Sequence, residues 1–166
     1  MFRTIAEFTS AWQGESASTL KVMQALTDAS LGQRVSPEGR SLGRLAWHVV
    51  QTLGEMGGHA GLAVGAANEH TPQPASAAAI AAAYQAGAAA VDKAVTGAWK
   101  DADLPVEIGM YGEKWTRAMT LRAIIQHEVH HRGQMTVLMR QAGLKVPGIY
   151  GPAREEWAVY GMPTQD

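Results

Sequence analysis

Residues 124–140 read I-I-Q-H-E-V-H-H-R-G-Q-M-T-V-L-M-R, and the interpretation of the whole chain starts from this stretch. In an α-helix, His127 and His131 are neighbours on one face, with their Cβ atoms about 5–6 Å apart. Apolar residues including Met135 and Leu138 follow the same face, so we expect the histidines to face an apolar interior. A buried imidazole without a partner is costly. The pair therefore needs a metal ion with a third ligand, or a hydrogen-bond network.

The length and composition favour one soluble domain that spans residues 1–166. A net charge of -1, with 17% charged residues and no basic block, argues against a nucleic-acid partner. The absence of cysteine excludes disulfides and thiolate ligands from the chain itself, and is compatible with the cytoplasm, where we expect the protein to reside. Residues 1–7 lack the apolar core of a signal peptide, and the sequence contains no apolar run of about 20 residues, so we expect no membrane association.

Helical periodicity covers most of the chain. Residues 2–28 carry apolar side chains at steps of three and four, with a weak point near Gly14. Ser41 is a suitable N-cap for a second helix, and His48 lies in the middle of that helix beside its apolar stripe. Residues 75–100 are rich in alanine, which favours a third helix.

The region before the fourth helix changes character. Residues 101–117 contain short apolar runs around two glycines, which predict a short hairpin or an extended loop. We expect the fourth helix to begin at Thr120 and to end near Gly143, followed by a short helical turn at residues 154–160. The fold class predicted is all-α: a four-helix bundle with a long crossover connection, which we place before the fourth helix.

Of the six histidines, His48 is the best third ligand for the 127/131 pair. His59 lies eleven residues after His48, about 16 Å along an unbroken helix axis, so the two cannot bind one ion. His130 is rotated about 100° from His131 and is the weaker candidate. His70 lies in a predicted loop, where a solvated histidine is expected.

Three neutral nitrogen ligands from two helices leave a coordination position for water or substrate, as in catalytic zinc sites. Imidazole also suits nickel, iron and copper, so the ligands do not select the metal. Periodicity alone leaves a second interpretation open, in which the histidines are core residues with hydrogen-bond partners.

The sequence H-E-V-H-H from His127 to His131 also contains the H-E-x-x-H pattern of zinc proteases, in which the glutamate is the general base. No histidine or glutamate follows at the usual later position, so the context argues against a protease. We interpret Glu128 instead as a surface partner of Arg132, four residues later on the helix. Gln134 follows His131 by three residues and can reach the site.

The segment L-A-W-H-V-V-Q around His48, followed by H-E-V-H-H-R-G-Q-M and R-Q-A-G-L-K-V-P, resembles the DinB family. The resemblance extends from the first helix through Tyr150. It implies a four-helix bundle with a long crossover, often dimeric. It also implies a divalent metal, zinc or nickel, held by residues that match His48, His127 and His131.

Members of this superfamily include metal-dependent S-transferases that use low-molecular-weight thiols, so the resemblance implies a thiol cofactor, a small-molecule substrate and a homodimer. Two other hypotheses stay open: a metal-dependent hydrolase, and a non-enzymatic metal-binding protein of the stress response. The sequence assigns no catalytic residue and no residue that binds the thiol.

Overall fold

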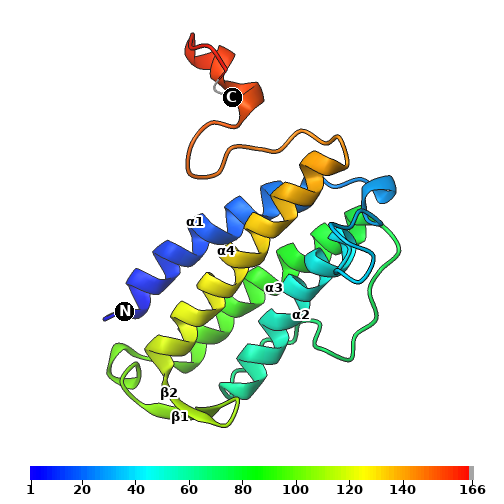
Figure 1. The fold of residues 1–166 in the computed structure, drawn as a ribbon. Helices are drawn as coiled ribbons and strands as arrows, with labels where there is room; N and C mark the ends of the chain where they lie inside the picture. Colours follow the sequence, from blue (N-terminus) through cyan, green and yellow to red (C-terminus); the bar gives the residue numbers. More distant parts are fainter. Residues whose placement is uncertain (165–166) are drawn as a thin grey trace.

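The computed structural model describes residues 1–164 of the chain, and this region is mostly helical (Figure 1). Its α-helices and strands are α1 (Ile5–Gln24), α2 (Leu42–His59), α3 (Ala77–Ala98), β1 (Glu107–Met110), β2 (Glu113–Thr116) and α4 (Arg117–Gln141). Short 3-10 turns, η1 (Asp28–Ser30), η2 (Asp101–Asp103) and η3 (Arg154–Tyr160), lie between and after them. The all-α bundle predicted from the sequence is confirmed.

Side-chain caps fix where the α-helices begin. Thr4, Ser41, Ser76 and Thr116 each accept a hydrogen bond from a backbone N–H in the first turn of the helix that follows. These caps satisfy donors that a helix start leaves unpaired, and each is worth about 1 kcal/mol. With Thr116 as its cap, α4 begins at Arg117, three residues before the predicted start at Thr120, and α1 continues unbroken through Gly14.

The helices pack in an order that differs from their order in the chain. α1 packs against α3 and α4, and α2 packs against the same two helices, so α1 and α2 lie diagonally across the bundle. In Figure 1, α1 and α4 run in one direction while α2 and α3 run in the other. His48 on α2 therefore faces the helix that carries His127 and His131.

The connection that returns the chain along the bundle joins α2 to α3, between residues 60 and 76 (Figure 1). The sequence predicts the crossover before α4, and that prediction is wrong. The returning segment lies directly on α2, because Gln51 donates a hydrogen bond of 2.8 Å to the carbonyl oxygen of Thr71. A Cβ atom at Gly54 would lie 2.3 Å from the carbonyl oxygen of Ala67. The glycines late in α2 thus permit close contact with the crossover.

The connection between α3 and α4 stays at one end of the bundle and contains the predicted hairpin. β1 and β2 pair antiparallel, with Met110 opposite Glu113. The turn between them uses positive φ angles at Tyr111 and Gly112, 53° and 85°. Such angles suit a tight hairpin turn. None of the helices within residues 1–164 is long and apolar enough to cross a membrane.

Candidate metal centre

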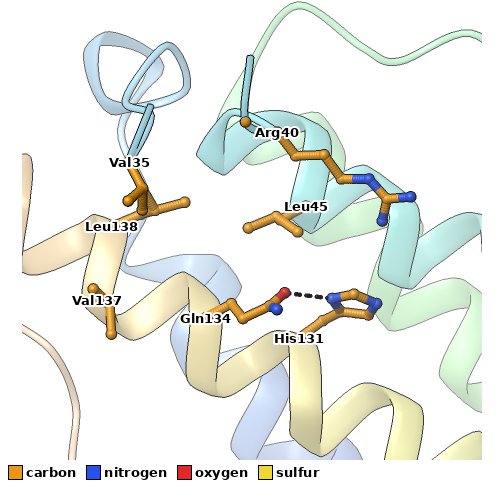
Figure 2. Close-up of a pocket in the computed structure, with 8 residues that line it drawn as sticks. Val35, Arg40, Leu45, His131, Gln134, Val137 and Leu138 are labelled. Atoms are coloured by element: carbon orange, nitrogen blue, oxygen red, sulfur yellow. Dashed lines mark hydrogen bonds between the residues drawn. The ribbon is translucent and has the colours of Figure 1, made fainter. Parts of the chain in front are cut away.

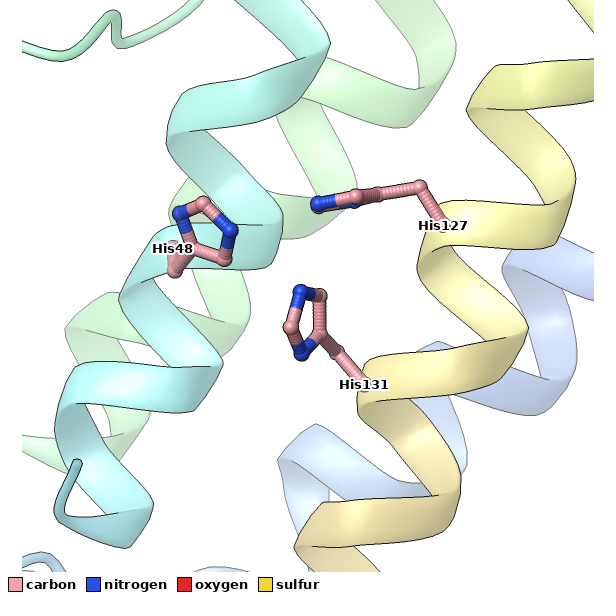
Figure 3. A group of neighbouring side chains, drawn as sticks. All are labelled: His48, His127 and His131. Atoms are coloured by element: carbon pink, nitrogen blue, oxygen red, sulfur yellow. The ribbon is translucent and has the colours of Figure 1, made fainter. Parts of the chain in front are cut away.

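Three histidines from two helices meet between α2 and α4 (Figure 3). His48 extends from α2, and His127 and His131 extend from successive turns of α4. The ring centroids are 5.0 Å apart for His48 and His127, 4.8 Å for His48 and His131, and 4.4 Å for the pair on α4. One ring nitrogen from each lies within 4.8 Å of the others. The structure thus brings together the three residues that the sequence selected.

The other histidines lie outside this cluster. His59, near the end of α2, packs edge-on against Tyr111 of the hairpin at 5.1 Å between ring centroids. His70 is exposed in the crossover and lies 3.5 Å from a Glu69 carboxylate oxygen. His130 contacts the edge of the cluster through its ring, 4.8 Å from that of His131. These positions agree with the helix geometry that set His59 and His130 aside.

Two cluster histidines have a hydrogen-bond partner on the far side of the ring. His131 Nδ1 lies 2.7 Å from Gln134 Oε1, which can only accept, so Nδ1 carries the proton. His127 Nδ1 lies 3.4 Å from the hydroxyl oxygen of Thr52, which itself donates to the carbonyl oxygen of Val49. A proton on Nδ1 leaves the lone pair on Nε2. This arrangement is the usual support for a metal-binding histidine.

The protein environment keeps the cluster neutral. Burial, together with the positive charge of Arg40, lowers the pKa of His48 to about 4. Burial and the neighbouring His131 lower the pKa of His127 to about 4, and burial also lowers the pKa of His131. Neutral imidazoles with free lone pairs at pH 7 are the donors that zinc and nickel accept. The side chains therefore fit a divalent metal.

One member of the cluster, His131, lines a cavity of about 460 Å³ between α2, α4 and the loop before α2 (Figure 2). His131 and Gln134 form its floor beside Leu45 and Leu138, and Arg40 extends along the α2 side. The sequence predicts that the histidine pair faces an apolar interior. His131 is 9% exposed where it lines the cavity, whereas His48 and His127 are half-buried.

Glu128 and Arg132 lie on a different face of α4, and our interpretation of them as a surface pair is wrong. Glu128 is 1% exposed and Arg132 is 2% exposed. Glu128 Oε1 accepts a hydrogen bond of 2.8 Å from the hydroxyl group of Tyr84 on α3. The glutamate of the H-E-x-x-H pattern therefore belongs to the bundle interior and not to the histidine cluster.

Arg132 is the centre of a buried polar network that joins α4 to α1 and to the C-terminal segment. Its guanidinium forms an ion pair with Glu15 at 2.7 Å and donates to Thr19 at 3.1 Å. It also donates to the hydroxyl oxygen of Tyr150 at 2.6 Å. Sequence periodicity missed this network because its partners do not lie on α4. Glu15 on α1 is 117 residues away from Arg132, and Tyr150 after α4 is 18 residues away.

The sequence model of the DinB family matches residues 1–166, the full length of the chain. The chain belongs to the DinB family. The YrdA protein of Bacillus subtilis is 44% identical over 162 residues, which cover 98% of this chain and 97% of that protein. The aligned region includes α2 and α4, the helices that carry the three histidines.

Two solved structures show the same architecture. A DinB-like protein from Bacillus cereus superimposes with a TM-score of 0.87 at 41% identity, covering 90% of this chain and 100% of the other. The DinB-like protein YjoA from Bacillus subtilis superimposes with a TM-score of 0.67 at 17% identity, over 89% of this chain and 99% of the other. The second comparison concerns the fold alone.

Proposed function

We propose that this DinB-family protein holds a divalent metal, zinc or nickel, through His48, His127 and His131, and transfers a low-molecular-weight thiol to a small electrophile. The observation that carries the proposal is the convergence of three neutral imidazoles, with ring nitrogens within 4.8 Å of one another, beside a cavity of about 460 Å³. Cavities of this size accommodate small molecules.

The number of protein ligands supports a catalytic metal site in preference to a closed structural site. Among residues 1–164, His48, His127 and His131 form the group that could hold an ion, and this group contains no fourth ligand. Structural zinc sites use four protein ligands, whereas catalytic sites keep one position open. Zn–N bonds of about 2.0–2.1 Å require the nitrogens to approach more closely, which small rotations of the rings allow.

The thiol must come from outside the protein, because the chain has no cysteine. A divalent metal at this site would lower the pKa of a thiol that reaches it, so that the thiolate is present at neutral pH. Gln134 and Thr52 hold the rings of His131 and His127 in orientation. Leu45 and Leu138 keep water away from one side of the cavity next to the site.

Hydrolysis is the alternative chemistry for such a site, and the surrounding residues support it less well. A hydrolase of the H-E-x-x-H class needs a carboxylate base beside the metal-bound water. Glu128 contacts Tyr84 on another face of α4, and no carboxylate of the described region lines the cavity. Thiol transfer does not require that base, because the thiol is the more acidic group.

Elemental analysis of freshly purified protein tests the metal site. We expect about one zinc or nickel per chain in the wild type and in His70→Ala, a matched control for loss of one histidine. His131→Ala should lose the metal. Wild-type protein that stays metal-free after incubation with zinc or nickel would overturn the proposal.

Conjugation to monochlorobimane tests the chemistry. The thiol releases its proton to solvent, the sulfur bonds to the chloromethyl carbon, and chloride leaves. We expect metal-dependent conjugation with at least one of bacillithiol, mycothiol and glutathione, and its loss in His131→Ala. Rates equal to the enzyme-free background with all three thiols would refute S-transfer. The homodimer and the cytoplasmic location stay predictions.

A further inference from the structure

Arg40 is a cation beside the candidate metal centre that the fold does not use. Its side chain extends along the α2 side of the cavity, with the guanidinium on the same side as the His131 ring (Figure 2). Within residues 1–164 it has no carboxylate partner, whereas Arg117, Arg132 and Arg140 each have one. An arginine beside a pocket that forms no ion pair within the protein has its N–H donors available to a ligand.

Among the described residues that line this cavity, the permanently charged one, Arg40, is positive. Arg40 and His131 line the same cavity, so the positive charge of the guanidinium lies beside the candidate metal centre. Arg44, on the first turn of α2, donates to Gln51 at 2.6 Å and adds a second positive charge. The cavity lining of the described region contains no acidic residue. A divalent metal with three neutral ligands would keep its full charge and strengthen this field.

The rest of the cavity is apolar. Leu45 and Leu138 are 6% and 2% exposed and form the deep wall. Val35 and Val137 are 69% and 55% exposed and line the cavity near the surface. A cavity with one cationic end and apolar walls selects ligands whose charge and hydrocarbon parts are arranged in the same way.

We propose that the cavity binds an organic carboxylate with a short apolar chain, whose carboxylate is held by Arg40 and whose chain lies against Leu45 and Leu138. This inference rests on the proposed function, because it names the class of electrophilic substrate that enters beside the metal. The guanidinium presents two parallel N–H donors, which match the two oxygens of a carboxylate. Arg40 is thereby assigned as a specificity-determining residue.

Binding of hexanoate and of its neutral analogue hexanamide, followed by ligand-observed NMR, tests the proposal. We expect wild-type protein to bind hexanoate about tenfold more tightly than hexanamide, because hydrogen bonds to charged groups are worth about that factor. Arg40→Gln should lose the preference and Arg40→Lys should retain part of it. Arg154→Gln, an exposed arginine on η3, is the matched control and should behave as wild type.

Val137→Asp supplies an independent test, since it introduces a negative charge at an exposed rim position without disturbing the core. It should weaken hexanoate binding and leave hexanamide binding unchanged. Equal binding of hexanoate and hexanamide by the wild type would overturn the proposal. Unchanged hexanoate binding in Arg40→Gln would also overturn it, because the carboxylate would then be held elsewhere.

The same samples separate this proposal from the proposed function. Arg40→Gln should retain the metal content of the wild type, since Arg40 is not a ligand. The preference for hexanoate is measured both with added zinc and after treatment with a chelator. A preference that depends on Arg40 in the chelated protein supports the carboxylate site even if the metal proposal fails. A metal-loaded protein without that preference refutes the carboxylate site alone.

Discussion

Two pairs of residues on α4 are offset from each other by one position in the sequence, and their surroundings are opposite. His127 and His131 face His48 on α2, His131 also lines an open cavity, and their partners leave a lone pair free on each ring. Glu128 and Arg132 face the bundle interior, where Arg132 is paired on several sides. The helix rotates by about 100° per residue, so this step separates the two environments.

The difference shows how one helix can serve binding and stability together. A buried ion pair is expensive to break, because its remaining partner stays desolvated. A neutral histidine beside a cavity costs less to leave without its metal, since water can reach the ring. We therefore expect substitutions on one face to change the free energy of unfolding and substitutions on the other to change metal affinity.

The largest effect is expected for Arg132→Leu. This change leaves the Glu15 carboxylate and the Thr19 hydroxyl without their partner. We expect a loss of about 3–5 kcal/mol in the free energy of unfolding, measured by urea denaturation. Arg122→Leu, an exposed position on the same helix, should cost less than about 0.5 kcal/mol. Equal losses in the two variants would show that the network does not stabilise the bundle.

Gln134→Met should act on the opposite face. It removes the oxygen that accepts from His131 Nδ1 at 2.7 Å, and methionine preserves the length and helix propensity of the side chain. We expect metal affinity to fall by about 10- to 100-fold in competition with a chelator. Gln141→Met, at the exposed end of α4, is the control. An unchanged affinity in Gln134→Met would mean that His131 needs no orienting partner.

The smallest effect is expected for Glu128→Gln, and it depends on pH. Burial raises the pKa of Glu128 to about 6 from 4.5, so the folded state holds its proton more tightly than the unfolded state. The stabilisation from this proton is complete below pH 4.5 and is lost as pH rises through 6. At pH 8 the variant should be more stable than wild type by about 2 kcal/mol at most.

At pH 4 the two proteins should have similar stability, because the amide oxygen of glutamine can still accept from Tyr84. Thermal unfolding of both proteins in chelator, from pH 4 to pH 8, measures the difference. A variant that is less stable than wild type at pH 8 would show that the ionised carboxylate is favourable in its buried position.

The sequence was sufficient for the residues whose relation is fixed by helix geometry. His127, His131 and Gln134 lie at spacings of three and four within one helix, so their proximity follows from the helical repeat. His48 could be selected because it lies in an apolar stripe on another helix, while His59 is too far along the same axis. The family resemblance, confirmed over the whole chain, supplied the pairing of α2 with α4.

Residues whose role depends on the packing partner could not be predicted in the same way. Glu128 has the spacing of a surface ion pair with Arg132, and only the positions of α1 and α3 show that both are buried. Gly54 and Gly57 make the end of the second helix uncertain when only the sequence is considered, and the structure shows that the crossover packs on them. The position of Arg40 at the cavity could not be predicted, because a charged residue in a loop is ordinarily solvated.

The order of the helices in space has a consequence for how the chain folds. Helices that are joined through residues 25–41 and 99–116 lie on the diagonals of the bundle, so neither pair can form a stable hairpin by itself. Most helix interfaces therefore join distant parts of the chain, and we infer slower folding than in an up-and-down bundle of this length. Chains emerge from the ribosome N-terminus first, so His48 on α2 is synthesised before His127 and His131 on α4. The candidate site comes into being only in the last stage of folding.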